Sequence, residues 1–176
     1  MHEYVSRFDQ STAALIRMLP AWVHPIMELA TLIGQPIFVI IIGAVVAVMS
    51  LIKGAERIAL ATCFGFVAFG INTLIKHAVH RARPDTIYAH GMRIKSYSFP
   101  SGHAFGSIFF YGLLAYLAFT HLPHPWNLVA TIALGILILC IGISRVYLGA
   151  HFPSDVVAGW LFGGLCLFVA VRLCKL

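Results

Sequence analysis

Three separated clusters of polar residues hold the side chains in this sequence that could do chemistry. The central cluster is Pro100-Ser101-Gly102-His103, which stands directly before a long apolar stretch. Serine is a favoured helix cap, and glycine lets the backbone approach a ligand closely. The first N–H groups of such a helix have no internal partner and carry partial positive charge. The cluster therefore predicts a site for an oxyanion such as phosphate, with an imidazole beside it.

Cations precede this central cluster. Lys76, His80 and Arg83 recur at i, i+4 and i+7, so they share one face of the predicted helix. Arginine offers a planar fork for phosphate oxygens, and lysine supplies a point charge. The alternative is that these side chains anchor the end of a membrane span at the headgroup level. Five of the 12 Lys and Arg residues lie between positions 76 and 95, so we expect this end of the protein to attract anions.

The third cluster begins with Ser144 and Arg145 and continues to His151 and Asp155. With Pro153 as the first residue of a helix, Asp155 lies in the first turn and can reach back to the imidazole of His151. A carboxylate on one ring nitrogen fixes the tautomer and leaves the other nitrogen available as a nucleophile or base. The alternative is a helix-capping carboxylate beside an interfacial histidine.

Together the clusters supply a complete set of groups for phosphoryl transfer through a phosphohistidine. His151 would attack phosphorus in line, and His103 would protonate the leaving oxygen and then deprotonate a water molecule. Two-metal hydrolysis needs several carboxylates, whereas only Asp85 and Asp155 are available here, so we expect no metal and no other cofactor. A serine hydrolase is excluded because the Gly-x-Ser-x-Gly turn is absent. The phosphate oxygens would be held by Lys76, Arg83, Ser101, Gly102 and Arg145.

The apolar composition indicates what must position these clusters. Hydrophobic residues make up 60% of the 176 residues and charged residues 10%, whereas about a quarter are charged in a soluble domain. A membrane span needs ~20 apolar residues. The sequence therefore predicts an all-α integral membrane protein, and its basic residues, which lie at span ends, do not indicate a nucleic acid partner. The uncharged stretches are residues 29–52, 58–75, 96–144 and 156–171.

The predicted architecture is a six-helix bundle of five spans plus an N-terminal helix, forming one transmembrane domain over residues 1–176. Residues 1–24 form an amphipathic segment suited to the membrane interface. Gly34-Gln35-Pro36 then interrupts the apolar pattern, which leaves two alternatives: one kinked span over residues 26–52, or a short helix followed by a span from Pro36. The later spans are expected at about residues 58–80, 102–120, 126–147 and 153–175.

Counting the crossings places all three clusters on one side of the membrane, at one depth. The opposite side carries cations at the span ends, which are Lys53, Arg57, Arg172 and Lys175. Under the positive-inside rule these residues mark the cytoplasmic side. We therefore expect the clusters to meet in a site that faces the periplasm or the exterior.

The clusters resemble the signature of the type 2 phosphatidic acid phosphatase superfamily. That signature reads Lys-x6-Arg-Pro, Pro-Ser-Gly-His and Ser-Arg-x5-His-x3-Asp, and it is complete here at residues 76–84, 100–103 and 144–155. The resemblance implies metal-independent hydrolysis of phosphate monoesters or diphosphates through a histidine intermediate, in a six-helix membrane fold. The resemblance also implies the roles described above for the motif residues, namely phosphate binding, acid–base catalysis by His103 and nucleophilic attack by His151 with Asp155.

We therefore expect a bacterial-type lipid phosphate phosphatase of the inner or plasma membrane. Its short loops look like those of prokaryotic members that act on undecaprenyl diphosphate, phosphatidylglycerol phosphate or phosphatidic acid. Undecaprenyl diphosphate is favoured because Arg81, Arg93 and Lys95 could hold a second phosphate, although the same residues could bind anionic headgroups. The expected partners are thus a phospholipid or polyprenyl phosphate substrate and the membrane lipids. The alternatives are a phosphotransferase that uses the same histidine and a non-catalytic lipid-binding protein.

Overall fold

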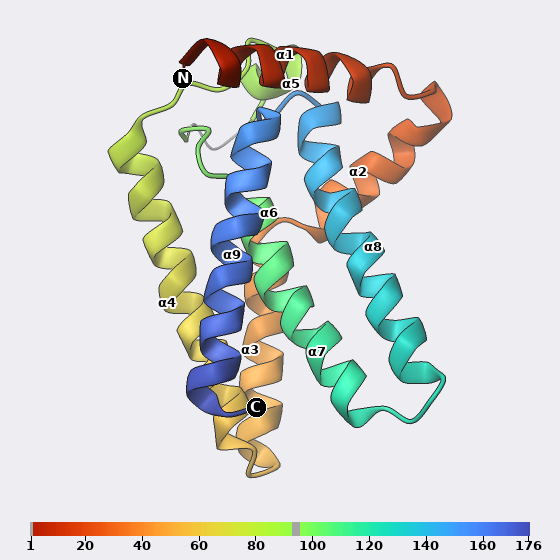
Figure 1. The fold of residues 1–176 in the computed structure, drawn as a ribbon, viewed down its shortest axis with the longest axis vertical. Coiled ribbons are helices and arrows are strands. Elements are labelled where there is room, and N and C mark those ends of the chain that lie inside the picture. Colours follow the sequence, from red (N-terminus) through yellow and green to blue (C-terminus); the bar gives the residue numbers. More distant parts are fainter. Residues whose placement is uncertain (1, 93–95) are drawn as a thin grey trace.

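The computed structural model describes residues 2–92 and 96–176, and within these ranges every regular element is helical (Figure 1). Four helices are long and apolar enough to cross a membrane, and a bent pair of helices supplies a fifth crossing if it is taken as one span. The predicted all-helical membrane architecture is thus confirmed. The four long helices are α4 (Glu56–Val79), the continuous helix of α6 (Gly102–Gly106), η2 (Ser107–Tyr111) and α7 (Gly112–His121), α8 (Trp126–Tyr147), and α9 (Pro153–Cys174).

The N-terminal helix α1 (His2–Arg17) lies across one end of the bundle instead of running along it (Figure 1). Its inner face carries Ala13 and Ile16, which pack with Val146 of α8 and Val156 of α9. Most of its other side chains are exposed, including large apolar ones. This combination suits a helix that lies in the membrane interface and covers the ends of the spans.

The chain breaks sharply at the predicted interruption before Pro36. The two helix axes on either side differ by 51°. Pro36 begins the second helix as its first residue, and the carbonyl of Ile33 accepts a hydrogen bond of 2.9 Å from the Tyr111 hydroxyl. The structure thus has two helices on either side of the break, which fits both alternatives in the sequence, one bent span or a short helix followed by a span from Pro36. The elements of this region are η1 (Ala21–Val23), α2 (His24–Ile33) and α3 (Pro36–Ile52).

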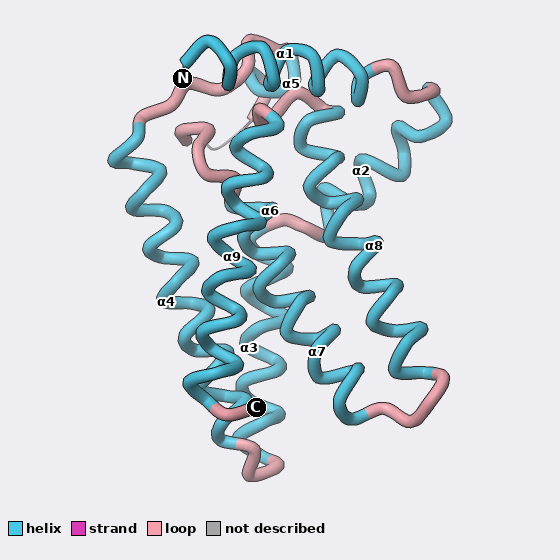
Figure 2. The backbone as a smooth tube through the Cα atoms, in the orientation of Figure 1, coloured by secondary structure: helices cyan, strands magenta, loops and turns pink. Residues whose placement is uncertain are grey.

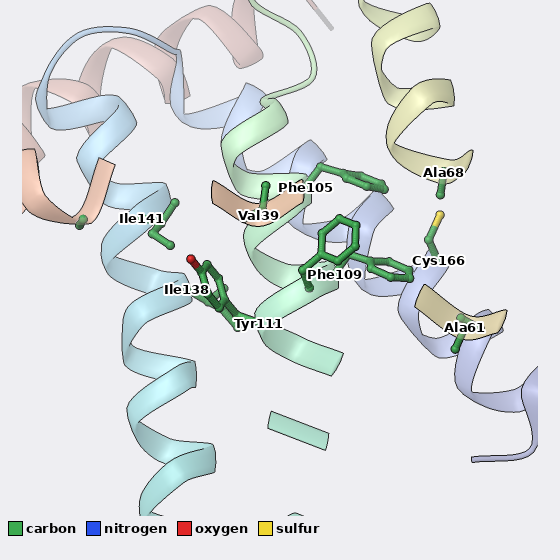
Figure 3. Close-up of a cluster of buried hydrophobic side chains, with 12 residues drawn as sticks. Val39, Ala61, Ala68, Phe105, Phe109, Tyr111, Ile138, Ile141 and Cys166 are labelled. Atoms are coloured by element: carbon green, nitrogen blue, oxygen red, sulfur yellow. The ribbon is translucent and has the colours of Figure 1, made fainter. Parts of the chain in front are cut away.

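The helix formed by α6 and α7 runs through the middle of the bundle, and its aromatic residues make the core (Figure 3). Phe105 and Phe109 are fully buried, with nearly parallel rings whose centroids lie 6.3 Å apart. Val39 of α3 and Cys166 of α9 belong to the same buried cluster. On the α4 side Gly65 leaves room for the Phe109 ring, which would come within 2.0 Å of a Cβ atom at that position.

The seam between α6 and α9 is formed by backbone against backbone. A Cβ atom at Gly159 would lie 2.6 Å from the carbonyl oxygen of Ser101, and one at Gly163 would lie 2.8 Å from that of Phe105. Glycines four residues apart commonly let two membrane helices approach this closely. The seam also brings the Ser101 amide within 3.0 Å of the Asp155 carbonyl, so the beginnings of the two helices are fixed side by side.

Because this seam has no space for a methyl group, we expect Gly159→Ala to destabilise the protein by about 1–3 kcal/mol, as overpacking does elsewhere. The free energy of unfolding in detergent micelles measures the effect. Gly164→Ala, on the same helix, is the matched control, since its Cβ atom would lie at an ordinary 3.8 Å from Ile108. Equal destabilisation by both variants would contradict a tight seam at Gly159.

The long polar connection from α4 to α6 stays at the end of the bundle that α1 covers (Figure 2). Its described residues include the short helix α5 (Ile87–His90), whose first turn is capped by the Thr86 hydroxyl. Thr86 also donates a hydrogen bond of 2.9 Å to the carbonyl of Gly149, in the turn between α8 and α9. The connection is therefore tied to the same turn that presents the third polar cluster.

Candidate active site

The candidate active site lies where α4 ends and where α6 and α9 begin, under α1 (Figure 1). Here a guanidinium nitrogen of Arg83 approaches Nε2 of His151 at 3.1 Å. The ammonium group of Lys76 donates to the carbonyl of Pro100 at 2.9 Å. Residues from all three sequence clusters are thus in direct contact, although they are far apart in the chain.

His151 is buried in the turn between α8 and α9, and its two ring nitrogens face different partners. Arg83 can only donate a hydrogen bond, so Nε2 must be the unprotonated nitrogen and Nδ1 carries the proton. Nδ1 faces the Asp155 carboxylate at 3.5 Å and the Ser98 hydroxyl at 3.4 Å. Burial lowers the pKa of His151 from its usual 6.5 to about 3. The imidazole is therefore neutral near pH 7, with a lone pair on Nε2.

Asp155 is fully buried in the first turn of α9, and both of its carboxylate oxygens are held. Oδ2 accepts hydrogen bonds from the Ser98 hydroxyl and, at 2.9 Å, from the amide of Phe152. Oδ1 accepts a hydrogen bond of 2.6 Å from Arg81. The carboxylate thus caps the helix and faces His151 at the same time, so the two interpretations of Asp155 from the sequence are compatible.

His103 stands in the first turn of α6, where Ser101 caps the helix by accepting a hydrogen bond of 3.4 Å from the amide of Ala104. The His103 side chain is half-buried, and it makes no hydrogen bond to any residue that the structure describes. It lies within electrostatic reach of Arg145 and His151. The ring nitrogens of His103 are therefore available to a molecule bound between His103, Arg145 and His151.

Lys76 is buried near the end of α4, and its ammonium group holds the chain that enters α6. It donates to the carbonyls of Tyr97, Ser98 and Pro100 at 2.8, 3.4 and 2.9 Å. These contacts shape the loop that presents the Ser101 cap. Direct contact between Lys76 and a phosphate remains a prediction.

Arg83 is held in the same way from several sides. It donates from Nε to the carbonyl of Ser96 at 2.8 Å and from Nη1 to the carbonyl of Ala150 at 2.8 Å. Burial and the neighbouring charge of Arg145 lower the pKa of Arg83. A positive charge that is crowded by another in this way is stabilised when an anion lies between them.

Arg145 is the most deeply buried cation of the site, with 2% of its surface exposed. Its Nη1 donates to the Thr31 hydroxyl of α2, and its guanidinium lies 5.7 Å from the ring centre of Tyr88. Its Nε has no partner among the residues that the structure describes. A buried donor without a partner is costly, and an anionic oxygen would satisfy it.

Arg81 does not lie where the sequence analysis put it. It was expected to hold a second phosphate, but its guanidinium lies between two carboxylates, Asp9 and Asp155, at 2.6 Å from each. It also stacks on the Phe152 ring, at 4.3 Å from the ring centre. Two carboxylates of the protein are already paired with this cation, which weakens the argument that it could hold a second phosphate. The other two cations of that expectation, Arg93 and Lys95, lie outside the described residues.

Several residues of the site were missed in the sequence analysis. Ser98 gives no signal beyond its place two residues before Pro100. Thr31 and Tyr88 reach Arg145 from other helices, so no local spacing marks them. Asp9 had a weak signal in the sequence, because it is an acid within the predicted amphipathic segment of residues 1–24. Its contacts could not have been inferred from the sequence.

Comparison with known proteins agrees with this arrangement. The family model described as the PAP2 superfamily matches residues 37–175, which include all three polar clusters. Phosphatidylglycerophosphatase B of Bacillus subtilis (strain 168) is 32% identical over 174 residues, which cover 90% of this chain and 78% of that protein. Undecaprenyl-diphosphatase of Sulfolobus acidocaldarius is 30% identical over 158 residues, which cover 83% of this chain and 72% of that protein.

The fold is similar to that of a solved relative as well. The crystal structure of a transmembrane PAP2 type phosphatidylglycerolphosphate phosphatase from Bacillus subtilis matches with a TM-score of 0.80 at 28% identity. The match covers 98% of this chain and 87% of that chain. The chain therefore belongs to the PAP2 superfamily, and it is an integral membrane enzyme that hydrolyses lipid phosphates.

Proposed function

We propose that this phosphatase hydrolyses a lipid phosphomonoester, such as phosphatidylglycerol phosphate or phosphatidic acid, through a phosphohistidine at His151. The observation that carries the proposal is the state of the His151 imidazole. The ring is neutral, its Nδ1 faces the Asp155 carboxylate, and its Nε2 lone pair points at the cation Arg83. This arrangement fits a nucleophile whose ring is oriented by a carboxylate at Nδ1 and whose Nε2 attacks an anion bound beside Arg83.

In the first step the Nε2 lone pair of His151 attacks phosphorus, so an N–P bond forms while the bond from phosphorus to the lipid oxygen breaks. His103 donates its proton to the leaving lipid oxygen. Arg83 and Arg145 balance the charge that grows on the phosphoryl oxygens, and the buried Nε of Arg145 gains a partner. The Asp155 carboxylate stabilises the positive charge that develops on the imidazole.

In the second step His103 accepts a proton from a water molecule, whose oxygen attacks the phosphoryl group from the opposite side. An O–P bond forms, the N–P bond breaks, and its electron pair returns to Nε2 of His151. Inorganic phosphate leaves, and His103 is again protonated for the next cycle. Neither step requires a metal ion or another cofactor.

A monoester is proposed ahead of the diphosphate favoured by the sequence, because the support for a second phosphate is weakened. That argument rested on Arg81, Arg93 and Lys95, and the first of these is paired with Asp9 and Asp155. Undecaprenyl diphosphate stays the second candidate, since one relative is an undecaprenyl-diphosphatase.

We also propose that the site faces the periplasm or the exterior, because Lys53 and Lys175 lie at the other end of the bundle, where both α3 and α9 end (Figure 1).

The test is phosphate release by the purified protein in lipid vesicles that contain EDTA. We expect release from phosphatidylglycerol phosphate and phosphatidic acid to exceed release from undecaprenyl diphosphate at equal surface concentration. A requirement for an added divalent metal would contradict the histidine mechanism. Faster turnover of the diphosphate would overturn the monoester preference alone. Appearance of the phosphoryl group on an added sugar or alcohol acceptor would instead identify a phosphotransferase.

A further inference from the structure

Arg81 is an inner link of a chain of charged contacts that begins at Asp9 in α1 and ends at His151, the proposed nucleophile. Its Nη2 donates to Asp9 at 2.6 Å, and its Nη1 donates to Oδ1 of Asp155 at 2.6 Å. Asp155 in turn faces His151 through its other oxygen, Oδ2. The chain therefore runs from Asp9 through Arg81 and Asp155 to His151.

Asp9 is unusual for an acid in an amphipathic surface helix, because only 2% of its surface is exposed. Its two oxygens accept hydrogen bonds of 2.8 Å from the amide and the hydroxyl of Ser154, in the first turn of α9. An isolated carboxylate is expensive to bury, so its burial here depends on these donors and on Arg81. Glu3, on the same helix, is exposed and pairs with Arg7.

We propose that Asp9 and Arg81 are positioning residues for the reaction, acting on His151 through the Asp155 carboxylate. The inference rests on the proposed role of His151 as the nucleophile. It makes α1 part of the functional site, although the family match begins only at residue 37.

The contacts of Arg81 give the physical reason. Its Nη2 binds Asp9 and its Nη1 is shared between the Ser154 hydroxyl, at 2.7 Å, and Asp155, so it binds Asp155 through one nitrogen and one oxygen only. Arginine alone with one carboxylate prefers a two-pronged arrangement that engages both oxygens. Without the charge of Asp9, the guanidinium is released to turn toward both oxygens of Asp155. Oδ2 would then be drawn away from His151 and Ser98, and the imidazole would lose its orientation.

The test compares Asp9→Asn, which keeps the size of the side chain and removes its charge, with Glu3→Gln, the matched change at the exposed acid of α1. Asp9→Asn removes one charge-assisted contact that helps to orient His151. We therefore expect this variant to lower kcat about 10-fold and to leave KM within about 2-fold of the wild-type value. Glu3→Gln should behave as the wild type. Arg81→Met should lower kcat at least as far as Asp9→Asn, and Arg81→Lys should recover part of the loss.

A double-mutant comparison separates positioning from a general effect on folding. If Asp9 acts through the carboxylate, Asp9→Asn causes no further loss of kcat when Asp155→Asn is already present. A loss of similar size in both backgrounds would show a merely structural role and would overturn the proposal. Wild-type kcat in Asp9→Asn would also overturn it. If His151→Ala retained full activity, the proposed function itself would fail, whatever the result at Asp9.

Discussion

Replacing His151 by alanine is expected to lower kcat by at least about 10⁴-fold, the largest effect of any single substitution in this protein. The change removes the proposed nucleophile, and removal of a covalent nucleophile elsewhere costs up to about 10⁶-fold. The side chains that hydrogen-bond to its ring, Ser98 and Arg83, cannot substitute, because Ser98 donates its hydroxyl to Asp155 and Arg83 carries no lone pair. The rate of phosphate release from vesicles measures the effect.

Trapping with radiolabelled lipid phosphate gives a second measurement on the same variant. Wild-type enzyme quenched during turnover should retain label that is stable in alkali and labile in acid, as a phosphorus–nitrogen bond is, whereas His151→Ala should retain none. His77→Ala is the control, since this exposed histidine packs on the Tyr97 ring at the edge of the site, with the ring centres 5.8 Å apart. Substantial turnover by His151→Ala would rule out the covalent intermediate.

Substituting Asp155 by asparagine is expected to lower kcat by about 10³- to 10⁴-fold with a small change in KM. The comparable substitution in serine proteases lowers kcat about 10⁴-fold because it favours the wrong tautomer of the histidine. Here the new amide N–H₂ group would donate toward Nδ1 of His151, so the ring proton would move to Nε2. That nitrogen would then have no lone pair for phosphorus, and it would also face the donors of Arg83.

The control for this variant is Asp85→Asn, the same substitution at an exposed carboxylate of the α4–α6 connection that pairs with His90. It should leave kcat unchanged. Because Asp155 also caps α9, its substitution is expected to lower the free energy of unfolding by about 1 kcal/mol, which thermal denaturation in micelles would report separately. A loss of kcat smaller than about 10-fold would show that the carboxylate serves α9 alone.

Much of the fold could be predicted from the sequence, because a bilayer restricts the chain to apolar helices of about one length. Trp126 and Tyr147 bound α8 in both the prediction and the structure, and Pro153 begins α9. The sequence indicated the break before Pro36, but it did not indicate the angle between the two helices that meet there. It depends on the Tyr111 hydroxyl, which lies far along the chain and satisfies the last carbonyl of α2.

The candidate site, like the fold, could be predicted from the sequence only in part. Arg83, His103 and His151 were expected together because motif spacing and the count of crossings place them at one depth. The pairing of Arg81 was not predicted, since a cation in a polar loop looks available to a ligand until its partner is known. That partner, Asp9, lies 72 residues earlier in the chain, on a helix that carries no motif. Contacts between such distant residues arise from packing, and no periodicity in the sequence encodes them.

The glycine seam has a consequence for how the enzyme responds to its lipid environment. Since α6 and α9 pack closely at Gly159 and Gly163, we expect the helices that bear His103 and Asp155 to move as one unit. A thicker or thinner bilayer is accommodated mainly by the tilt of helices relative to the membrane normal. Tilting this pair together would leave the side chains of His103 and Asp155 in register. Turnover of bound substrate should therefore be nearly independent of acyl-chain length, while lipid entry varies with it.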